Sequence, residues 1–258
     1  MVTIVIPARF QSARFQGKPM AMLRGATGLK KSLIQRSWEA ASRVPEAARV
    51  IVATDDTRIA DHAKSFGAEV MMTSANAANG TERCAEVAKN LPEAELIVNL
   101  QGDAPLTPPE FVTAVIAAMG TANMATPVLR ADPKTLRRLQ SDRAQGLVGG
   151  TTAVFDRSHR ALYFSKEVLP FSDTLGPSDA VFHHVGLYAY RPEALRQYAT
   201  WPMGPLERIE GLEQLRFLEN GVAVKCVEVE AKNRVFWEVN NPPDIERVEA
   251  ALAEMGMV

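Results

Sequence analysis

Short apolar runs alternate with amphipathic segments along the first half of this chain. Runs rich in β-branched residues predict four buried strands, at residues 2–6, 49–53, 69–72 and 96–100. Segments with apolar positions at helical spacing predict helices between and after them, at residues 32–42, 58–66, 80–90 and 108–119. Strands and helices that alternate at this spacing predict an α/β fold with a doubly wound, mostly parallel sheet.

The pattern becomes less regular after residue 121. Apolar runs predict strands at residues 124–128, 151–155, 185–190 and 222–229, and helical spacing predicts helices at 205–220 and 242–255. No internal repeat or linker composition separates these elements from the first half of the chain. We therefore expect one domain over residues 1–258, with a smaller mixed β extension embedded at about 125–190 that could cover a ligand and carry a subunit interface.

The composition is that of a globular protein without a basic excess. Of the 258 residues, 47% are hydrophobic and 23% charged, and the formal net charge is -1. This balance argues against a general binder of nucleic acid or of membrane surfaces, and no run approaches the roughly 20 apolar residues of a membrane span. Cys84 and Cys226 lack metal-ligand spacing, so we predict that they are reduced core residues of a cytoplasmic protein.

Cationic side chains are spaced through the segment that follows the first predicted strand. The segment contains Arg9, Ser12, Arg14, Gly17 and Lys18. Arginine offers planar forks to phosphate oxygens, lysine adds a mobile charge and glycine allows close backbone approach. We therefore predict a loop that holds a polyphosphate, although a solvated surface loop is the alternative, and the Gly-Lys-Ser/Thr of a Walker A loop is absent from it.

Further polar residues stand where the predicted parallel strands end, which is where ligands bind in doubly wound sheets. They are Asp55, Arg83 and the triplet Gln101-Gly102-Asp103. A glutamine amide can recognise the edge of a base, and a carboxylate is a suitable ligand for Mg²⁺. The alternative for the triplet is a turn that caps the following helix.

The second half of the chain contains two candidate polar faces. In the helix predicted over 205–220, Glu207, Glu210 and Gln214 follow a 3–4 spacing, for which a solvated face is the alternative. In the strand predicted nearby, His184 and Tyr188 would share one face. No carboxylate accompanies the histidine at zinc spacing, so we expect either hydrogen bonding to a hydroxylated or acidic substrate or a core histidine.

Taken together, these motifs resemble those of a known family over nearly the whole chain. The motifs are Ile6-Pro7-Ala8-Arg9, Gly17-Lys18-Pro19, Val52-Ala53-Thr54-Asp55, Gly80-Thr81-Glu82-Arg83, Gln101-Gly102-Asp103, His184-Val185-Gly186-Leu187-Tyr188 and Leu212-Glu213-Gln214-Leu215-Arg216. The chain resembles the cytidylyltransferases that make CMP-sugar acids, and most closely the 3-deoxy-manno-octulosonate cytidylyltransferase (CMP-Kdo synthetase) family. The resemblance implies a homodimeric enzyme of lipopolysaccharide biosynthesis that uses Mg²⁺. In its reaction, the anomeric hydroxyl of a sugar acid attacks the α-phosphorus of CTP and pyrophosphate leaves.

The resemblance also implies roles for individual residues. Those expected to be catalytic are Arg9, Lys18 and Asp103. Those expected to bind the nucleotide are Ala8, Arg9, Ser12, Arg14, Lys18, Asp55, Arg83 and Gln101. Those expected to bind the sugar acid are Lys166, His184, Tyr188, Glu213 and Gln214. Asp103 and Asn240 stand at the family's magnesium positions.

The chain departs from the family pattern at several positions. Asn240 replaces an aspartate that serves as the second magnesium carboxylate, and a neutral amide binds Mg²⁺ less well. The other departures are Ala104 for an acidic residue, Thr152 for lysine, Lys166 for arginine, Ala77 for histidine and Asn79 for serine. We expect a divergent member that still uses CTP. The alternatives are a catalytically impaired, CTP-binding paralogue with a regulatory role and a nucleotidyltransferase for another sugar acceptor.

Overall fold

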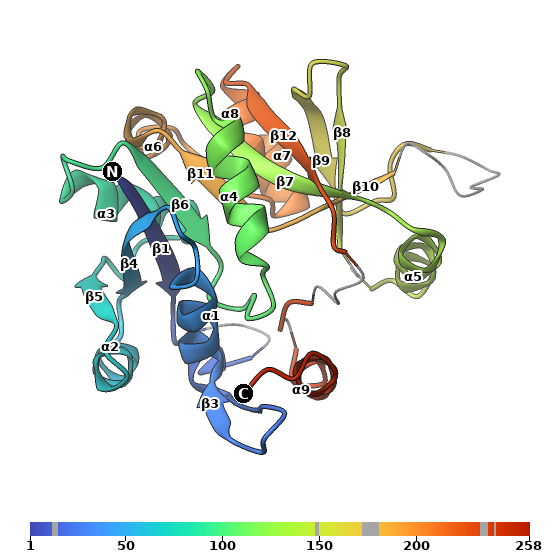
Figure 1. Cartoon of the computed structure of the whole chain (residues 1–258). Helices are drawn as coiled ribbons and strands as arrows, with labels where there is room; N and C mark the ends of the chain where they lie inside the picture. Colours follow the sequence, from blue (N-terminus) through green and yellow to red (C-terminus); the bar gives the residue numbers. More distant parts are fainter. Residues whose placement is uncertain (12–14, 148–149, 172–180, 233–236, 240) are drawn as a thin grey trace. The chain divides into compact units, whose positions relative to one another are not determined.

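The protein is described by a computed structural model that covers residues 1–258 except 12–14, 148–149, 172–180, 233–236 and 240. It consists of two compact units (Figure 1). The first unit contains Met1–Thr113 and Ala231–Val258, and the second contains Ala114–Glu230. The expected extension at about 125–190 lies within the second unit.

The first unit is built on four parallel strands in the order β5-β4-β1-β6 (Figure 1). Their bounds are β1 Val2–Ala8, β4 Ala47–Thr54, β5 Glu69–Met72 and β6 Leu96–Leu100. The central strand β1 is apolar on both faces because helices cover a parallel sheet on both sides. The side chains of Ile34 in α1 and of Ile6 both approach Gly102, whereas Gly80 of α3 lies against Pro7. Neighbouring strand residues point to opposite faces, so the two helices cover opposite faces and the predicted doubly wound α/β class is confirmed.

The other elements of the first unit surround this sheet. They are η1 Lys18–Met20, the hairpin β2 Met22–Arg24 and β3 Lys30–Ser32, and the helices α1 Leu33–Ala41, α2 Thr57–Ser65, α3 Gly80–Lys89 and α9 Asp244–Glu254. Helix α4, Pro109–Ala118, contains the boundary between the units. Three helices begin at side-chain caps: Ser32 accepts from the backbone N–H of Gln35, Asp56 from that of Arg58, and Asn79 from that of Glu82.

The second unit is a mixed sheet around β7. Its strands are β7 Met124–Arg130, β8 Thr151–Phe155, β9 Ala161–Ser165, β10 Phe182–His184, β11 Leu187–Tyr190 and β12 Val224–Val229. Strand β12 pairs with β7 in parallel, while β10 and β11 pair with β7 antiparallel. Strands β8 and β9 continue the sheet beyond β10. The single strand predicted over 185–190 is therefore wrong in its bounds, because the backbone leaves the ladder at Val185 and Gly186.

Among the described residues, the helices that lie wholly within the second unit are α5 Pro133–Ala144, α6 Pro192–Tyr198, α7 Pro205–Glu210 and α8 Leu215–Glu219. The single helix predicted over 205–220 is wrong, because Gly211 adopts the left-handed conformation with φ of 63° and ends α7. Apolar spacing continues through the break, so periodicity alone could not reveal it. Glu207, Glu210 and Gln214 therefore do not share one helix face.

Both cysteines lie in apolar interiors, as predicted. Cys84 and Cys226 are free thiols and both are buried. Burial raises the pKa of the Cys226 thiol to about 12, so it stays protonated and unreactive near neutral pH. No helix in the described part of the chain combines the length and the apolar character that a membrane crossing requires.

Candidate active site

The strand order of the first unit creates a ligand position between β1 and β6. The chain steps from β1 outward to β4 and β5, and then returns to the other side of β1 with β6. At such a reversal, the loops that follow the two strands diverge and leave a crevice at their carboxyl ends. The cationic segment follows β1, and the triplet Gln101-Gly102-Asp103 follows β6. The fold therefore delivers both predicted motifs to the same crevice.

An ion pair joins these two motifs. Lys18 Nζ donates to Asp103 Oδ2 at 2.5 Å. Both side chains remain partly exposed, 17% for the lysine and 21% for the aspartate, so a ligand can reach them. The lysine ammonium also offsets the charge of a carboxylate that would otherwise repel a polyphosphate.

Close packing fixes the backbone of the β6 triplet. A Cβ atom on Gly102 would lie 2.9 Å from the carbonyl oxygen of Pro7 and 3.3 Å from Ile34 Cδ1. The Ser37 hydroxyl donates to the Gly102 carbonyl oxygen at 3.0 Å. Only glycine fits without displacing β1, so the positions of Gln101 and Asp103 depend on this contact.

Amide side chains gather beside the start of α3. A Cβ atom on Gly80 would lie 3.0 Å from Asn99 Nδ2 and 3.3 Å from Gln101 Nε2. Asn99 is fully buried, and neither of its amide atoms has a hydrogen-bond partner in the described part of the chain. The sequence analysis missed Asn99, although a polar residue in an otherwise apolar strand was an available signal.

Arg83 forms an ion pair with Asp55 and, unlike Lys18, is almost completely buried. The Arg83 side chain is only 3% exposed, and its Nη2 lies 3.2 Å from Asp55 Oδ2. Its Nη1 also donates to the Thr73 hydroxyl at 2.6 Å and to the Ser74 carbonyl oxygen at 3.3 Å. Arg83 is thus engaged by protein groups, whereas Asp55 Oδ1 is buried and has no partner among the described residues. Of the two, Asp55 retains an oxygen that could accept a hydrogen bond from a ligand.

The remaining nucleotide candidates surround the start of the cationic segment. Ala8 is buried at the end of β1 and Arg9 is exposed directly after it. The segment closes on itself where the N–H of Gly17, with φ of 68°, donates to the Phe10 carbonyl oxygen at 2.8 Å. The candidates Ser12, Arg14 and Asn240 lie outside the described residues.

Asp103 is the candidate carboxylate for a divalent cation at the end of β6. Within the described ranges, no group of three or more histidine, cysteine, aspartate or glutamate side chains could hold a metal. Mg²⁺ in nucleotide sites commonly uses one or two carboxylates and completes its coordination with phosphate oxygens and water. The exposed part of the Asp103 carboxylate fits that mode of binding.

The acceptor candidates of the second unit include a buried neutral histidine. The Thr126 hydroxyl lies 2.9 Å from His184 Nε2 and donates to the Leu187 carbonyl oxygen at 2.8 Å. Because that hydroxyl has a single proton, Nε2 must carry the imidazole hydrogen and Nδ1 is left as an acceptor. Burial, together with the nearby His183, lowers the pKa of His184 to about 3. The ring is therefore uncharged near neutral pH.

Tyr188 and Gln214 extend this polar group. The rings of His184 and Tyr188 lie 5.6 Å apart, although they belong to two strand segments. The Tyr188 hydroxyl donates to Gln214 Oε1 at 3.2 Å. Gln214 is 1% exposed, and its Nε2 has no acceptor among the described residues. A buried donor without a partner is costly unless a ligand or water satisfies it, so Gln214 offers an N–H to a bound oxygen.

The other acceptor candidates lie at the ends of β9 and α7. The Lys166 backbone N–H donates to Glu210 Oε2 at 2.9 Å, and Ser165 Oγ donates to Glu210 Oε1 at 2.7 Å. A Cβ atom on Gly211 would lie 3.0 Å from Lys166 Nζ, so the lysine reaches the turn between α7 and α8. Glu213 belongs to the same turn and is partly exposed.

Three of the departures from the family pattern have local structural roles. Thr152 is buried, and its hydroxyl donates to the Glu167 carbonyl oxygen at 2.6 Å. Asn79 caps α3 through its side chain. Ala104 is buried in the turn after β6, where its N–H donates to the Gln101 carbonyl oxygen at 3.1 Å. These three positions therefore stabilise the backbone around the candidate residues.

Comparisons with known proteins identify relatives over almost the full length of the chain. A family model described as cytidylyltransferase matches residues 3–230. The 3-deoxy-manno-octulosonate cytidylyltransferase of Maricaulis maris is 41% identical over 99% of this chain and 98% of its own. That of Haemophilus influenzae is 40% identical over 97% and 98% of the two chains. The solved structure of CMP:2-keto-3-deoxy-manno-octonic acid synthetase complexed with CTP has a TM-score of 0.84 and 31% identity, and the match covers 98% of this chain and 99% of that one.

Proposed function

Because this chain belongs to the cytidylyltransferase family, among the 3-deoxy-manno-octulosonate cytidylyltransferases, we propose that it transfers CMP from CTP to the anomeric hydroxyl of 3-deoxy-manno-octulosonate and releases pyrophosphate. The observation that carries the proposal is the match over 98% of the chain, with a TM-score of 0.84, to a synthetase complexed with CTP. The match includes both units, and so includes the candidates for both substrates.

The crevice between β1 and β6 supports the nucleotide half of the proposal. Arg9 and Lys18 supply positive charge for the triphosphate, and Asp103 is the carboxylate for a bound Mg²⁺. Gln101 and Asp55 contribute amide and carboxylate groups that can pair with the donors and acceptors of the base and ribose. Arg83 serves the nucleotide indirectly, by holding Asp55 in place.

The acceptor half rests on hydrogen-bonding groups buried in the second unit. A sugar acid carries hydroxyls that donate and carboxylate oxygens that accept. His184 Nδ1 is an acceptor, and Gln214 Nε2 is a donor without a partner among the described residues. Lys166 and Glu213 add opposite charges near the same turn, which suits an acidic, polyhydroxylated substrate.

The chemistry requires positioning and charge neutralisation more than a covalent nucleophile. The anomeric oxygen forms a bond to the α-phosphorus as the bond from that phosphorus to pyrophosphate breaks, and the hydroxyl loses its proton. Mg²⁺, when bound, would neutralise negative charge on the phosphates. Arg9 and Lys18 stabilise the same charge, and Asp103 orients the Lys18 ammonium through their ion pair.

The same proposal includes the setting in which the enzyme works. We expect a cytoplasmic homodimer that uses Mg²⁺ and supplies an activated sugar acid to lipopolysaccharide biosynthesis. The family membership supports these expectations.

The direct test is pyrophosphate release together with detection of the CMP-sugar product. With CTP, Mg²⁺ and 3-deoxy-manno-octulosonate, we expect product in equal amount to pyrophosphate. CTP binding without turnover on this acceptor or its 8-amino analogue would contradict the proposal and favour an impaired paralogue. Turnover only with a sugar phosphate, or with UTP or GTP in place of CTP, would favour a different nucleotidyltransferase.

Variants of the Lys18–Asp103 pair test the assigned groups. We expect Lys18→Met and Asp103→Asn each to lower kcat/KM by about 100-fold, because each removes charge stabilisation in the transition state. The control is the Lys31–Glu39 pair, with 18% and 22% exposure and an Nζ–Oε1 distance of 2.8 Å, in the same unit. Lys31→Met should leave kcat/KM within about twofold of wild type. An equal loss in the control would mean that the effect is structural.

A further inference from the structure

We propose that Glu207 and Arg216 are positioning residues, whose buried ion pair fixes the turn that carries Glu213 and Gln214 toward the acceptor. The inference rests on the proposed function, because it assigns that turn to the sugar acid. Glu207 stood on a candidate polar face in the sequence analysis, but neither residue of the pair was among those expected to bind the sugar acid.

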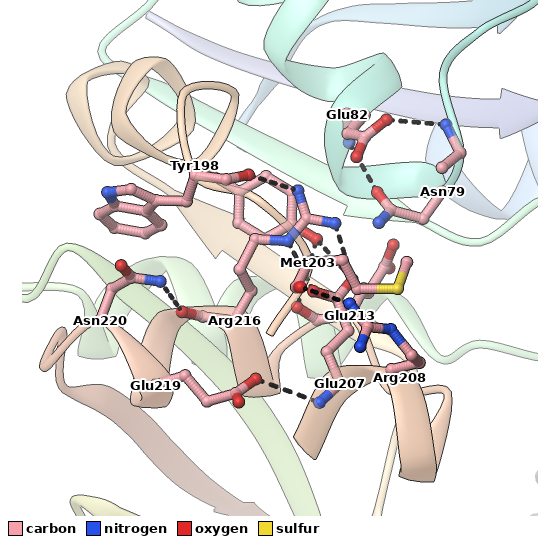
Figure 2. A network of polar contacts seen from close by, with 12 residues as sticks. Asn79, Glu82, Tyr198, Met203, Glu207, Arg208, Glu213, Arg216, Glu219 and Asn220 are labelled. Atoms are coloured by element: carbon pink, nitrogen blue, oxygen red, sulfur yellow. Dashed lines mark hydrogen bonds and ion pairs between the residues drawn. The ribbon is translucent and has the colours of Figure 1, made fainter. Parts of the chain in front are cut away.

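The pair closes the break between α7 and α8. Helix α7 ends at Gly211, and the chain makes a turn before α8 begins at Leu215. Arg216 Nε donates to Glu207 Oε2 at 2.6 Å, and Nη2 donates to Glu207 Oε1 at 2.8 Å. Figure 2 shows the two side chains meeting from the two helices. Both are 3% exposed, so water does not weaken this two-pronged contact.

Tyr198 links the pair to the backbone of the turn. Its hydroxyl lies 3.4 Å from Glu207 Oε1 and 3.3 Å from the Glu213 carbonyl oxygen. The Arg216 guanidinium lies over the Tyr198 ring, 4.1 Å from its centroid, and the ring stacks on Phe217 at 4.9 Å. The ion pair, the aromatic ring and the carbonyl oxygen beside Gln214 therefore hold one another in a single arrangement.

A second tie runs from α8 back to the start of α7. Glu219 Oε1 accepts from the Leu206 N–H at 2.9 Å. Glu219 Oε2 accepts from the Glu207 N–H at 3.1 Å, as Figure 2 shows. A Cβ atom on Gly204 would collide with the Glu219 carboxylate, so a larger residue there would displace that carboxylate from these two N–H groups. Both ties join α8 to the first half of α7, and Tyr198 contacts the Glu213 carbonyl oxygen between them, so the intervening turn has little freedom.

An ion pair and an apolar pair at these two positions would differ in how they orient the turn more than in how they stabilise the protein. A buried ion pair costs desolvation, and an apolar pair of similar volume is often equally stable or more stable. An apolar pair lacks the direction that a planar guanidinium imposes on a carboxylate. If the role of the pair is positioning, its replacement by methionines should therefore impair acceptor use while the protein stays folded.

The experiment compares the double variant Glu207→Met/Arg216→Met with Tyr198→Phe and wild type. We expect KM for 3-deoxy-manno-octulosonate to rise about tenfold in the double variant and about threefold in Tyr198→Phe, with the Kd for CTP within about twofold of wild type. Hydrogen exchange at the amides of 211–214 should accelerate in both variants. The matched control is Glu193→Gln, which breaks the exposed Arg196–Glu193 pair of α6 and should change none of these values.

The outcomes separate this inference from the proposed function. Absence of CMP transfer in wild type would refute the proposed function itself. If wild type is active, two results would overturn the positioning role. One is an acceptor KM in the double variant equal to that of wild type, and the other is a loss of CTP affinity in the double variant as large as its rise in acceptor KM. If the double variant does not fold, Tyr198→Phe decides, because it removes one hydroxyl and keeps the ring: an unchanged acceptor KM would then refute the inference.

Discussion

His184 is a buried side chain whose protonation couples folding to pH. Burial lowers its pKa to about 3 in the folded protein, against about 6.5 for an exposed histidine. The unfolded chain therefore binds the proton more readily, and the histidine's contribution to stability is complete above about pH 6.5 and is lost as the pH falls toward about 3. We expect this group to lower the free energy of unfolding by about 2 kcal/mol between about pH 7 and pH 5.

Chemical denaturation at a series of pH values measures this effect. His184→Gln cannot titrate. Between about pH 6 and pH 4.5, it should therefore reduce the slope of the free energy of unfolding against pH by the amount that corresponds to about one bound proton. His183, whose pKa burial lowers to about 4, keeps its own contribution to that slope. Thr126→Val is the control, because it removes the hydrogen bond to His184 and keeps the imidazole. It should lower stability at every pH with the slope retained. An unchanged slope in His184→Gln would contradict the buried, neutral state.

The residue types in the sequence indicated what chemistry each candidate side chain could perform, but not whether a ligand could reach it. Lys18 and Arg83 are both cations placed after strands, and the sequence analysis assigned both to the nucleotide. In the structure, Lys18 remains partly exposed beside Asp103, whereas Arg83 is buried against Asp55 and two further oxygen atoms. Burial depends on long-range packing, so a local motif could not distinguish the two.

At the scale of elements, the first unit was predicted more accurately than the second. The four strands of its parallel sheet are largely apolar runs followed by polar turns, and each local pattern agrees with that sheet, although the hairpin β2–β3 was not predicted. In the second unit, apolar spacing continues through the break at Gly211 and through the interruption at Val185 and Gly186. At Gly211, the buried Glu207–Arg216 pair holds the two helices on either side of the turn. Such contacts join residues that no periodic pattern relates.

The same unit contains elements that the sequence analysis did not predict. They include the helices α5 and α6 and the strand β9. Helix α5 is mostly polar and exposes most of its surface, so its hydrophobic signal is weak, although Asp132 caps it and Pro133 begins it.

The end of β6 depends on a contact between two strands, and Gly102→Ala tests it. The added Cβ would lie 2.9 Å from the Pro7 carbonyl oxygen, so the turn must move away from β1. We expect a loss of about 1–3 kcal/mol in stability from this overpacking, with about a tenfold loss of CTP affinity because Gln101 and Asp103 move with the turn. Thermal denaturation and CTP titration provide the two measurements.

Ser37→Ala is the matched control for this prediction. It removes the hydrogen bond to the Gly102 carbonyl oxygen without adding an atom, and should cost about 1 kcal/mol. Its CTP affinity should remain closer to wild type than that of Gly102→Ala. Equal losses of CTP affinity in both variants would mean that the hydrogen bond, and not the close approach, holds the triplet.

At the scale of the whole molecule, each unit contains its own group of polar candidate residues. The first contains the Lys18–Asp103 pair at the ends of parallel strands, and the second contains the His184, Tyr188 and Gln214 group beside the α7–α8 turn. A transferase must recognise two chemically different substrates, and under the proposed function the first of these groups would bind the triphosphate and the second, with Lys166 and Glu213, the sugar acid. Substitutions in one unit should therefore change the binding of one substrate more than that of the other.

The proposed homodimer leads to a prediction about strand β9. This strand ends the order of strands in the second unit, and Leu162 in its middle is 61% exposed. An edge strand with an exposed apolar side chain favours pairing with another chain unless a partner covers it. We expect Leu162→Glu to shift the protein from dimer to monomer at micromolar concentration, as measured by sedimentation velocity, because a charge at a buried interface is costly.

Met22→Glu is the control in the first unit, at a residue that is 48% exposed, and should leave the dimer intact. A Leu162→Glu protein that stays dimeric would exclude β9 from the interface, and a monomeric wild type would refute the homodimer itself.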